Sequence, residues 1–175
     1  MAYTTPKTWA VDELLAATDM NTYVRDNVAA LKNPPSFLTA FASGALVLST
    51  TATTFTAISS ALSASLGTYG GDIMVFIQLQ LAGDKGTRRI SLDWLVNGTA
   101  LYGAYAFGAG RALPGIATGS TSAMGNTTVF GPLLVTGLAS GTHVFQPVWK
   151  TNTGTAFTWA TTGAAPIIMW VREVS

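Results

Sequence analysis

The sequence predicts a mainly β protein, in which an N-terminal arm and helix precede an antiparallel, jelly-roll-like β-sandwich. Three observations predict this class. Short runs of alternating apolar and polar residues recur after residue 36, turn-forming Gly, Ser and Asn separate them, and only the segment 12–32 has helical spacing. The length of 175 residues suits one domain with a short appendage. We place the boundary after Pro35, giving an arm and helix (1–35) and a sandwich (36–175).

The segment 12–32 contains no Gly or Pro and is rich in good helix formers, which predicts a helix. Thr18 before Asp19 is a candidate internal N-cap, and in that case residues 9–15 form a separate short turn. Two prolines after Asn33 end the helix. Large apolar residues recur along it at helical spacing: Met20, Val24, Val28 and Leu31.

A second series in the same helix follows a 3-4-3-4 spacing: Ala17, Met20, Val24, Asn27 and Leu31. Three helices could meet along such a seam, with Asn27 as the polar position that fixes the register. Two heptads are too short to hold alone, and the alternative is that the stripe packs on its own sandwich or on another protein. The candidate residues for attachment or oligomerisation are Trp9, Met20, Val24, Asn27 and Leu31.

Strands are predicted from alternation. In 72–81 every second residue from Ile73 to Leu81 is apolar, with Gln78 and Gln80 on the other face, and 90–96 alternates likewise through Trp94. Asn97-Gly98 then predicts a hairpin into 99–107. The apolar piece 37–48 has a length that suits core strands, and 108–125 is predicted to be a long loop. Further strands are predicted at 46–49, 54–58, 127–136, 142–150, 155–161 and 167–174.

Composition excludes several functional classes. A net charge of +1 lacks the basic excess that nucleic-acid binding needs. No apolar run reaches the roughly 18 residues of a membrane span, and acidic residues stand where a secretory signal needs its apolar core. The chain has no cysteine and one histidine, His143. We therefore expect no metal site, no cofactor and no enzymatic activity.

His143 lies on the same strand face as Phe145 and Trp149, which favours a packed or interfacial histidine over a catalytic base. Trp94 is predicted to be a core residue. For Trp149, Trp159 and Trp170 the pattern leaves core and inter-subunit contact open, and an aromatic platform for sugars is a further alternative. Only 10% of the residues are charged, so many Ala, Thr and apolar side chains of the sandwich must face outward. Such surfaces are typical of subunit interfaces.

The N-terminal segment resembles a known group. Thr8-Trp9, residues 16–27 (AATDMNTYVRDN) and residues 31–35 (LKNPP) are similar to the leader of small virion proteins of tailed bacteriophages. Residues 140–145 (SGTHVF) and 171–174 (VREV) resemble the C-terminal part of the same proteins. Residues 11–14 (VDEL) depart from the Gly-Glu of the commoner leader, so the contacts of that turn do not transfer.

This resemblance implies a virion structural protein, synthesised in the host cytoplasm and located in the virion, with no catalytic residue to carry over. We expect a homotrimeric head decoration or tail appendage that contacts other virion proteins through its N-terminal segment. The alternative is a receptor- or glycan-binding module at the tail tip, which needs exposed aromatics beside polar groups. A third hypothesis, an enzyme acting on cell-wall sugar, needs a carboxylate pair for which the sequence offers few acids.

Overall fold

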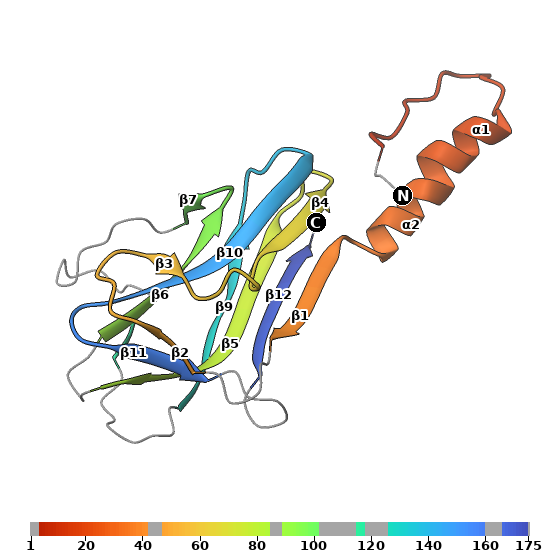
Figure 1. Cartoon of the computed structure of the whole chain (residues 1–175). Coiled ribbons are helices and arrows are strands. Elements are labelled where there is room, and N and C mark those ends of the chain that lie inside the picture. The colour runs from red at the N-terminus through yellow and green to blue at the C-terminus, as the bar shows by residue number, and fades with distance from the viewer. Residues whose placement is uncertain are drawn as a thin grey trace.

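Two antiparallel β-sheets and one helical N-terminal segment make up the described part of the chain (Figure 1). The structure is a computed structural model that describes residues 4–41, 47–84, 89–101, 115–117, 126–159 and 166–174. The predicted mainly β class and the antiparallel pairing are confirmed. The jelly-roll subclass and the domain boundary after Pro35 stay predictions.

The first sheet has the order β1-β12-β5-β11-β2, and β9 pairs with β5 outside this path. Its strand β5 is the longest and contacts three partners, because β12 pairs with its first half, β11 with its second half and β9 with its other edge. The strands are β1 Ser36–Phe41, β2 Val47–Thr50, β5 Ile73–Gly83, β9 Asn126–Val135, β11 Ala156–Trp159 and β12 Ile167–Glu173.

The second sheet has the order β3-β10-β6-β7, with β4 paired to β10 and β8 paired to β6. The strands are β3 Thr56–Ala57, β4 Ala64–Thr68, β6 Arg89–Val96, β7 Thr99–Ala100, β8 Gly115–Ala117 and β10 Gly141–Thr151. Strand β4 was not predicted, because its small residues give only a weak alternation. Strand β8 falls inside the predicted loop 108–125, so that prediction is wrong for these three residues, whose backbone pairs with Arg89 to Ser91.

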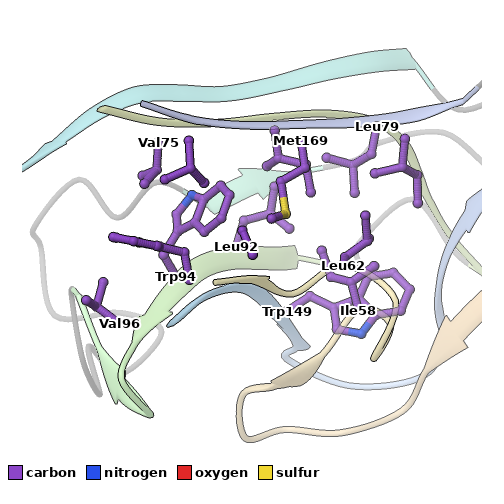
Figure 2. Packing of buried hydrophobic residues seen from close by; sticks show 14 of the residues in the cluster. Ile58, Leu62, Val75, Leu79, Leu92, Trp94, Val96, Trp149 and Met169 are labelled. Carbon is purple, nitrogen blue, oxygen red and sulfur yellow. The ribbon is translucent and has the colours of Figure 1, made fainter. Parts of the chain in front are cut away.

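The core lies between the two sheets and follows the predicted alternation. Every second residue of β5 from Ile73 to Leu81 is at most 1% exposed, and Trp94 is fully buried. Figure 2 shows the Trp94 ring between the sheets, with Val75 and Met169 of the first sheet opposite it. Trp149 is also a core residue, at 1% exposure. For Trp149, one of the three tryptophans for which the pattern left core and inter-subunit contact open, the structure thus shows a core position.

The Asn97-Gly98 hairpin is confirmed. Both residues have positive φ, 51° and 81°, as a two-residue turn of this type requires. Leu95 pairs with Ala100 and Val96 with Thr99 across it. The remainder of the predicted strand beyond residue 101 lies outside the described residues.

One continuous helix covers residues 17–32, built from α1 Ala17–Met20, a π-helical segment η1 Asn21–Asp26 and α2 Asn27–Lys32. The predicted start at residue 12 is wrong, because Asp12 has a φ of +64° in a turn that precedes the helix. Thr18 is not the N-cap either: the cap position is Ala16, which makes no side-chain cap bond. The alternative of a separate turn before the helix is therefore the one observed.

Candidate assembly surfaces

The N-terminal arm, residues 4–16, folds back along the helix (Figure 1). Its far end is held by Asn27, whose side-chain Nδ2 donates to the Thr4 carbonyl at 2.7 Å and to the Tyr23 carbonyl at 3.1 Å. The Thr4 amide donates in turn to Asn27 Oδ1 at 2.8 Å. Asn27 is only 5% exposed. A buried amide with these three bonds fixes the arm on one face of the helix.

Lys7 holds the middle of the arm. Its ammonium group donates to Glu13 and, at 2.9 Å, to Asp19 of the helix. It also lies 4.7 Å from the centre of the Trp9 ring, and Trp9 meets Tyr23 edge to face with ring centres 6.4 Å apart. These contacts place Trp9 against the helix, half-buried.

Hydrogen bonding sets the charge state of this cluster. The bond to Glu13, and then the bond to Asp19, raise the pKa of Lys7 above its usual range. The pKa of Glu13 is lowered, first by Lys7 and second by the Ala10 amide, which donates to Glu13 Oε2 at 3.0 Å. The Lys7 and Glu13 side chains keep 30% and 29% of their surface in water, so solvent screens the pair.

The arm leaves an apolar face of the helix uncovered. We call its residues the helix stripe: Met20, Val24, Val28 and Leu31, which are 41%, 44%, 58% and 64% exposed. Asn27 does not belong to it, because its amide is bonded to Thr4 and Tyr23. The predicted seam, in which Asn27 sets the register of three helices, therefore does not coincide with the exposed helix stripe. Of the five candidate residues, the structure brings Met20, Val24 and Leu31 together in the stripe. Trp9 belongs to the arm and packs on Tyr23, and Asn27 lies under the arm.

A second exposed apolar group lies on the turn before the helix, which we call the tip. Val11 and Leu14 are each 92% exposed, and Leu15 is 61% exposed. Figure 1 shows that this turn is the part of the chain farthest from the sheets. Val11, Leu14 and Leu15 have the i, i+3, i+4 spacing of a helix, so the sequence does not identify the tip, which forms a turn around Asp12.

The helix is joined to the first sheet by a short anchored exit. The Pro35 carbonyl accepts a hydrogen bond of 2.9 Å from the Glu173 amide, which extends the pairing of β1 with β12. Glu173 is 1% exposed, and its carboxylate accepts from the amides of Tyr69 and Gly71, the latter at 2.7 Å. One residue therefore fixes both the helix exit and the turn between β4 and β5.

Part of the outer face of the first sheet is also apolar, whereas Gln78 and Gln80 stand on the same face in the second half of β5. We call the following residues the sheet face: Leu38, Met74, Phe76, Leu134, Ile168 and Trp170. They stand in register across β1, β12, β5 and β9, because Leu38 pairs with Trp170, Trp170 with Phe76, and Met74 with Leu134. Leu38 is 69% and Leu134 is 52% exposed. An antiparallel sheet that faces water on one side normally carries polar residues there, so this face is typical of an interface.

The structure resolves Trp170, whose role the pattern left open, as an outward residue of the sheet face. It says nothing of the Trp159 side chain, which lies outside the described set.

Within the described ranges, no helix is long and apolar enough to cross a membrane. The same residues contain no group of three or more His, Asp or Glu side chains arranged to hold a metal ion.

Comparisons with known proteins give one distant structural match. No family model matches the sequence, and no curated protein does. Among solved structures, VP2 in the crystal structure of an infectious bursal disease virus subviral particle matches with a TM-score of 0.42 and 13% identity. The match covers 79% of this chain and 37% of that chain.

Proposed function

We propose that this protein is a non-enzymatic structural component of a tailed-bacteriophage virion, a head decoration or tail appendage, and that its N-terminal segment is the assembly device. The observation that carries the proposal is the helical segment itself. It stands away from the sandwich, is closed on one side by its own arm, and presents the helix stripe and the tip to the outside. The likeness of residues 16–27 to phage virion leaders supports the virion context.

The sandwich supports the same proposal. Its core is continuous between two antiparallel sheets, and the charge-poor sheet face offers a surface for self-association in a homotrimer. Apolar groups dominate the assembly surfaces, while residues 1–35 carry three basic and four acidic side chains that nearly balance. Attachment through the tip is therefore expected to depend little on salt.

The experiment adds purified protein to particles that lack it and measures the bound fraction after sedimentation at low and high salt. Three forms are compared: the full chain, a chain beginning at Pro34, and the double variant Val11→Ser with Leu14→Ser. We expect only the full chain to bind, at both salt concentrations. Val144→Ser, which changes an exposed apolar residue of β10, is the matched control and should bind like the full chain.

Equal binding by the chain that begins at Pro34 would show that the sandwich carries the docking surface, and the proposal for the N-terminal segment would then be wrong. Copy number per particle separates the two locations. A high copy number indicates a head decoration, and a low one indicates a tail appendage.

A glycan-binding module is not the function that the geometry supports best. Such a site needs exposed aromatics beside polar groups. In the described part of the chain, Trp94 and Trp149 are buried, and Trp9 packs on Tyr23. Trp170 stands between Leu38 and Phe76, in an apolar row that favours a protein contact over a sugar.

A further inference from the structure

We infer that the helix stripe of one copy packs on the sheet face of a second copy of the same chain. The inference concerns contacts between copies, so it does not rest on the virion context. Its basis is that one chain presents two apolar faces of matching chemistry and length. The short connection between the helix and β1 prevents these two faces from meeting within the same chain.

The two faces have the chemistry of two halves of one core. The helix stripe consists of Met, Val and Leu, and the sheet face consists of Leu, Ile, Met, Phe and Trp. Arg172 is the one outward charge on β1, β5, β9 and β12. Packing the apolar stripe of a helix on the apolar face of a sheet is the standard way in which proteins bury both.

The dimensions also agree. A helix of 16 residues, from Ala17 to Lys32, is about 24 Å long. Strand β12, which carries Trp170 and Ile168 in the middle of the sheet face, has 7 residues and is also about 24 Å long. One helix laid along β12 would therefore lie over Ile168 and Trp170, with Leu38 of β1 and Phe76 of β5 on either side of Trp170.

The connection prevents this contact within one chain. Pro35 is already part of the sheet, because its carbonyl accepts from Glu173, so only Asn33 and Pro34 remain to reverse the chain. Each of these two residues precedes a proline, which disfavours the helical conformation at both positions and keeps the backbone extended. The helix consequently continues away from β1 (Figure 1). A second copy is the occupant of the sheet face that satisfies this constraint.

Cysteine cross-linking tests the contact directly, since the natural chain has no cysteine. Val24→Cys is introduced in one tagged copy and Leu38→Cys in a differently tagged copy, and the two are co-expressed and oxidised. We expect a disulfide between copies that joins positions 24 and 38. Val24→Cys paired with Val144→Cys is the control, because Val144 is 42% exposed on the second sheet, and it should give no comparable link.

A cross-link mainly between two Val24→Cys copies would indicate a helix-to-helix seam and overturn the inference. A doubly substituted chain, Val24→Cys with Leu38→Cys, provides the second test. A disulfide within one chain, distinguished by mixing isotope-labelled and unlabelled copies before oxidation, would also overturn it. The absence of any cross-link at micromolar concentration has the same consequence.

A charge substitution gives an independent measurement without cysteine. Val24→Glu with Val28→Glu lies in the N-terminal segment, so the sandwich should still fold. We expect the dissociation constant between copies, measured by native mass spectrometry, to rise at least about 30-fold, the loss typical of removing one central interface residue. Unchanged association of this variant would show that the stripe is not in the interface. These tests use the purified protein alone, so their failure is distinct from a failure of particle attachment.

Discussion

Asn97 and His143 are joined by a hydrogen bond of 2.8 Å, in which the side-chain Nδ2 of Asn97 donates to the ring Nδ1 of His143. The other ring nitrogen, Nε2, donates to the Ala139 carbonyl at 2.8 Å, which assigns the ring proton to Nε2. Asn97 Oδ1 also accepts from the Val144 amide at 2.9 Å. The histidine thus ties the β6–β7 turn to β10, as expected of a packed residue.

Replacing His143 should therefore cost stability. His143→Ala removes two hydrogen bonds at a half-buried site, and we expect the free energy of unfolding to fall by about 1 to 2 kcal/mol. Denaturant melts measure the change, and Thr142→Ala, an exposed neighbour on β10, should leave the midpoint unchanged. A loss of particle function by His143→Ala at unchanged stability would contradict a purely structural role.

Two tryptophans, Trp94 in the core and Trp170 on the outer face of the first sheet, form a matched pair. Trp94→Ala should lower the free energy of unfolding by about 3 to 5 kcal/mol, because its fully buried ring leaves a large cavity. Trp170→Ala, on the half-exposed sheet face, should cost only about 1 to 2 kcal/mol in the isolated monomer. The reverse order would mean that the assignment of inner and outer faces is inverted.

Asn27 should control the arm. Asn27→Ala removes the partner of both the Thr4 amide and the Thr4 carbonyl, so we expect faster hydrogen exchange at residues 4–9 while exchange in the sandwich is unchanged. Asn21→Ala, at an exposed position of the same helix, is the control. Unchanged hydrogen exchange at residues 4–9 in Asn27→Ala would show that the other contacts of the arm are enough to hold it on the helix.

The Lys7–Glu13 pair makes the attachment of the arm to the helix dependent on pH. The pKa of Glu13 is lowered from 4.5. Its contribution to holding the arm is therefore complete above pH 4.5 and is lost as the pH falls through the lowered pKa. The pKa of Lys7 is raised from 10.5, so its contribution is complete below pH 10.5 and is lost only at higher pH. We expect the arm to loosen in acid.

The fluorescence of Trp9, obtained as the difference between the protein and Trp9→Phe, measures this transition. Glu13→Gln should remove most of the acid change, because it deletes the carboxylate that Lys7 binds. A Trp9 signal that is constant from neutral pH to below pH 4 would contradict the assignment of this pair.

A chain that begins at Pro34 should keep the sandwich. It retains Pro35, whose carbonyl pairs with Glu173, and it removes no residue of the core cluster. We expect its melting temperature to stay within a few degrees of the full chain. A chain that begins at Ser36 lacks this bond and should melt lower. A large drop in the melting temperature of the chain that begins at Pro34 would show that the N-terminal segment is part of the folding unit.

Much of the sandwich could be read from the sequence because strand periodicity is a local property. The alternation around Trp94 and from Ile73 to Leu81 has one interpretation, since a shift of one residue would expose the entire core face. The Asn97-Gly98 turn is equally local, because its backbone conformation strongly favours these two residue types. Strand β4 was missed because Leu66 is its only large apolar residue, which is too few to establish an alternation.

The helix shows where periodicity is insufficient. Two overlapping series fit it, and between Met20 and Leu31 they differ at one position, Asn27 or Val28. A sequence pattern cannot choose between them, because the choice depends on which face the arm covers. The Thr4 backbone, 23 residues away, decides it by binding Asn27.

By itself, the sequence determined the class, the inner faces of the central strands and the apolar character of the helix, because these follow from residues within a few positions of each other. Only the tertiary structure decided which apolar residues stay exposed. Trp149 and Trp170 lie in similar strand patterns, yet one is buried between the sheets and the other faces outward, because burial depends on the layer that packs on each face. The helix stripe and the sheet face are surfaces of the assembled fold, formed by strands and segments far apart in the chain.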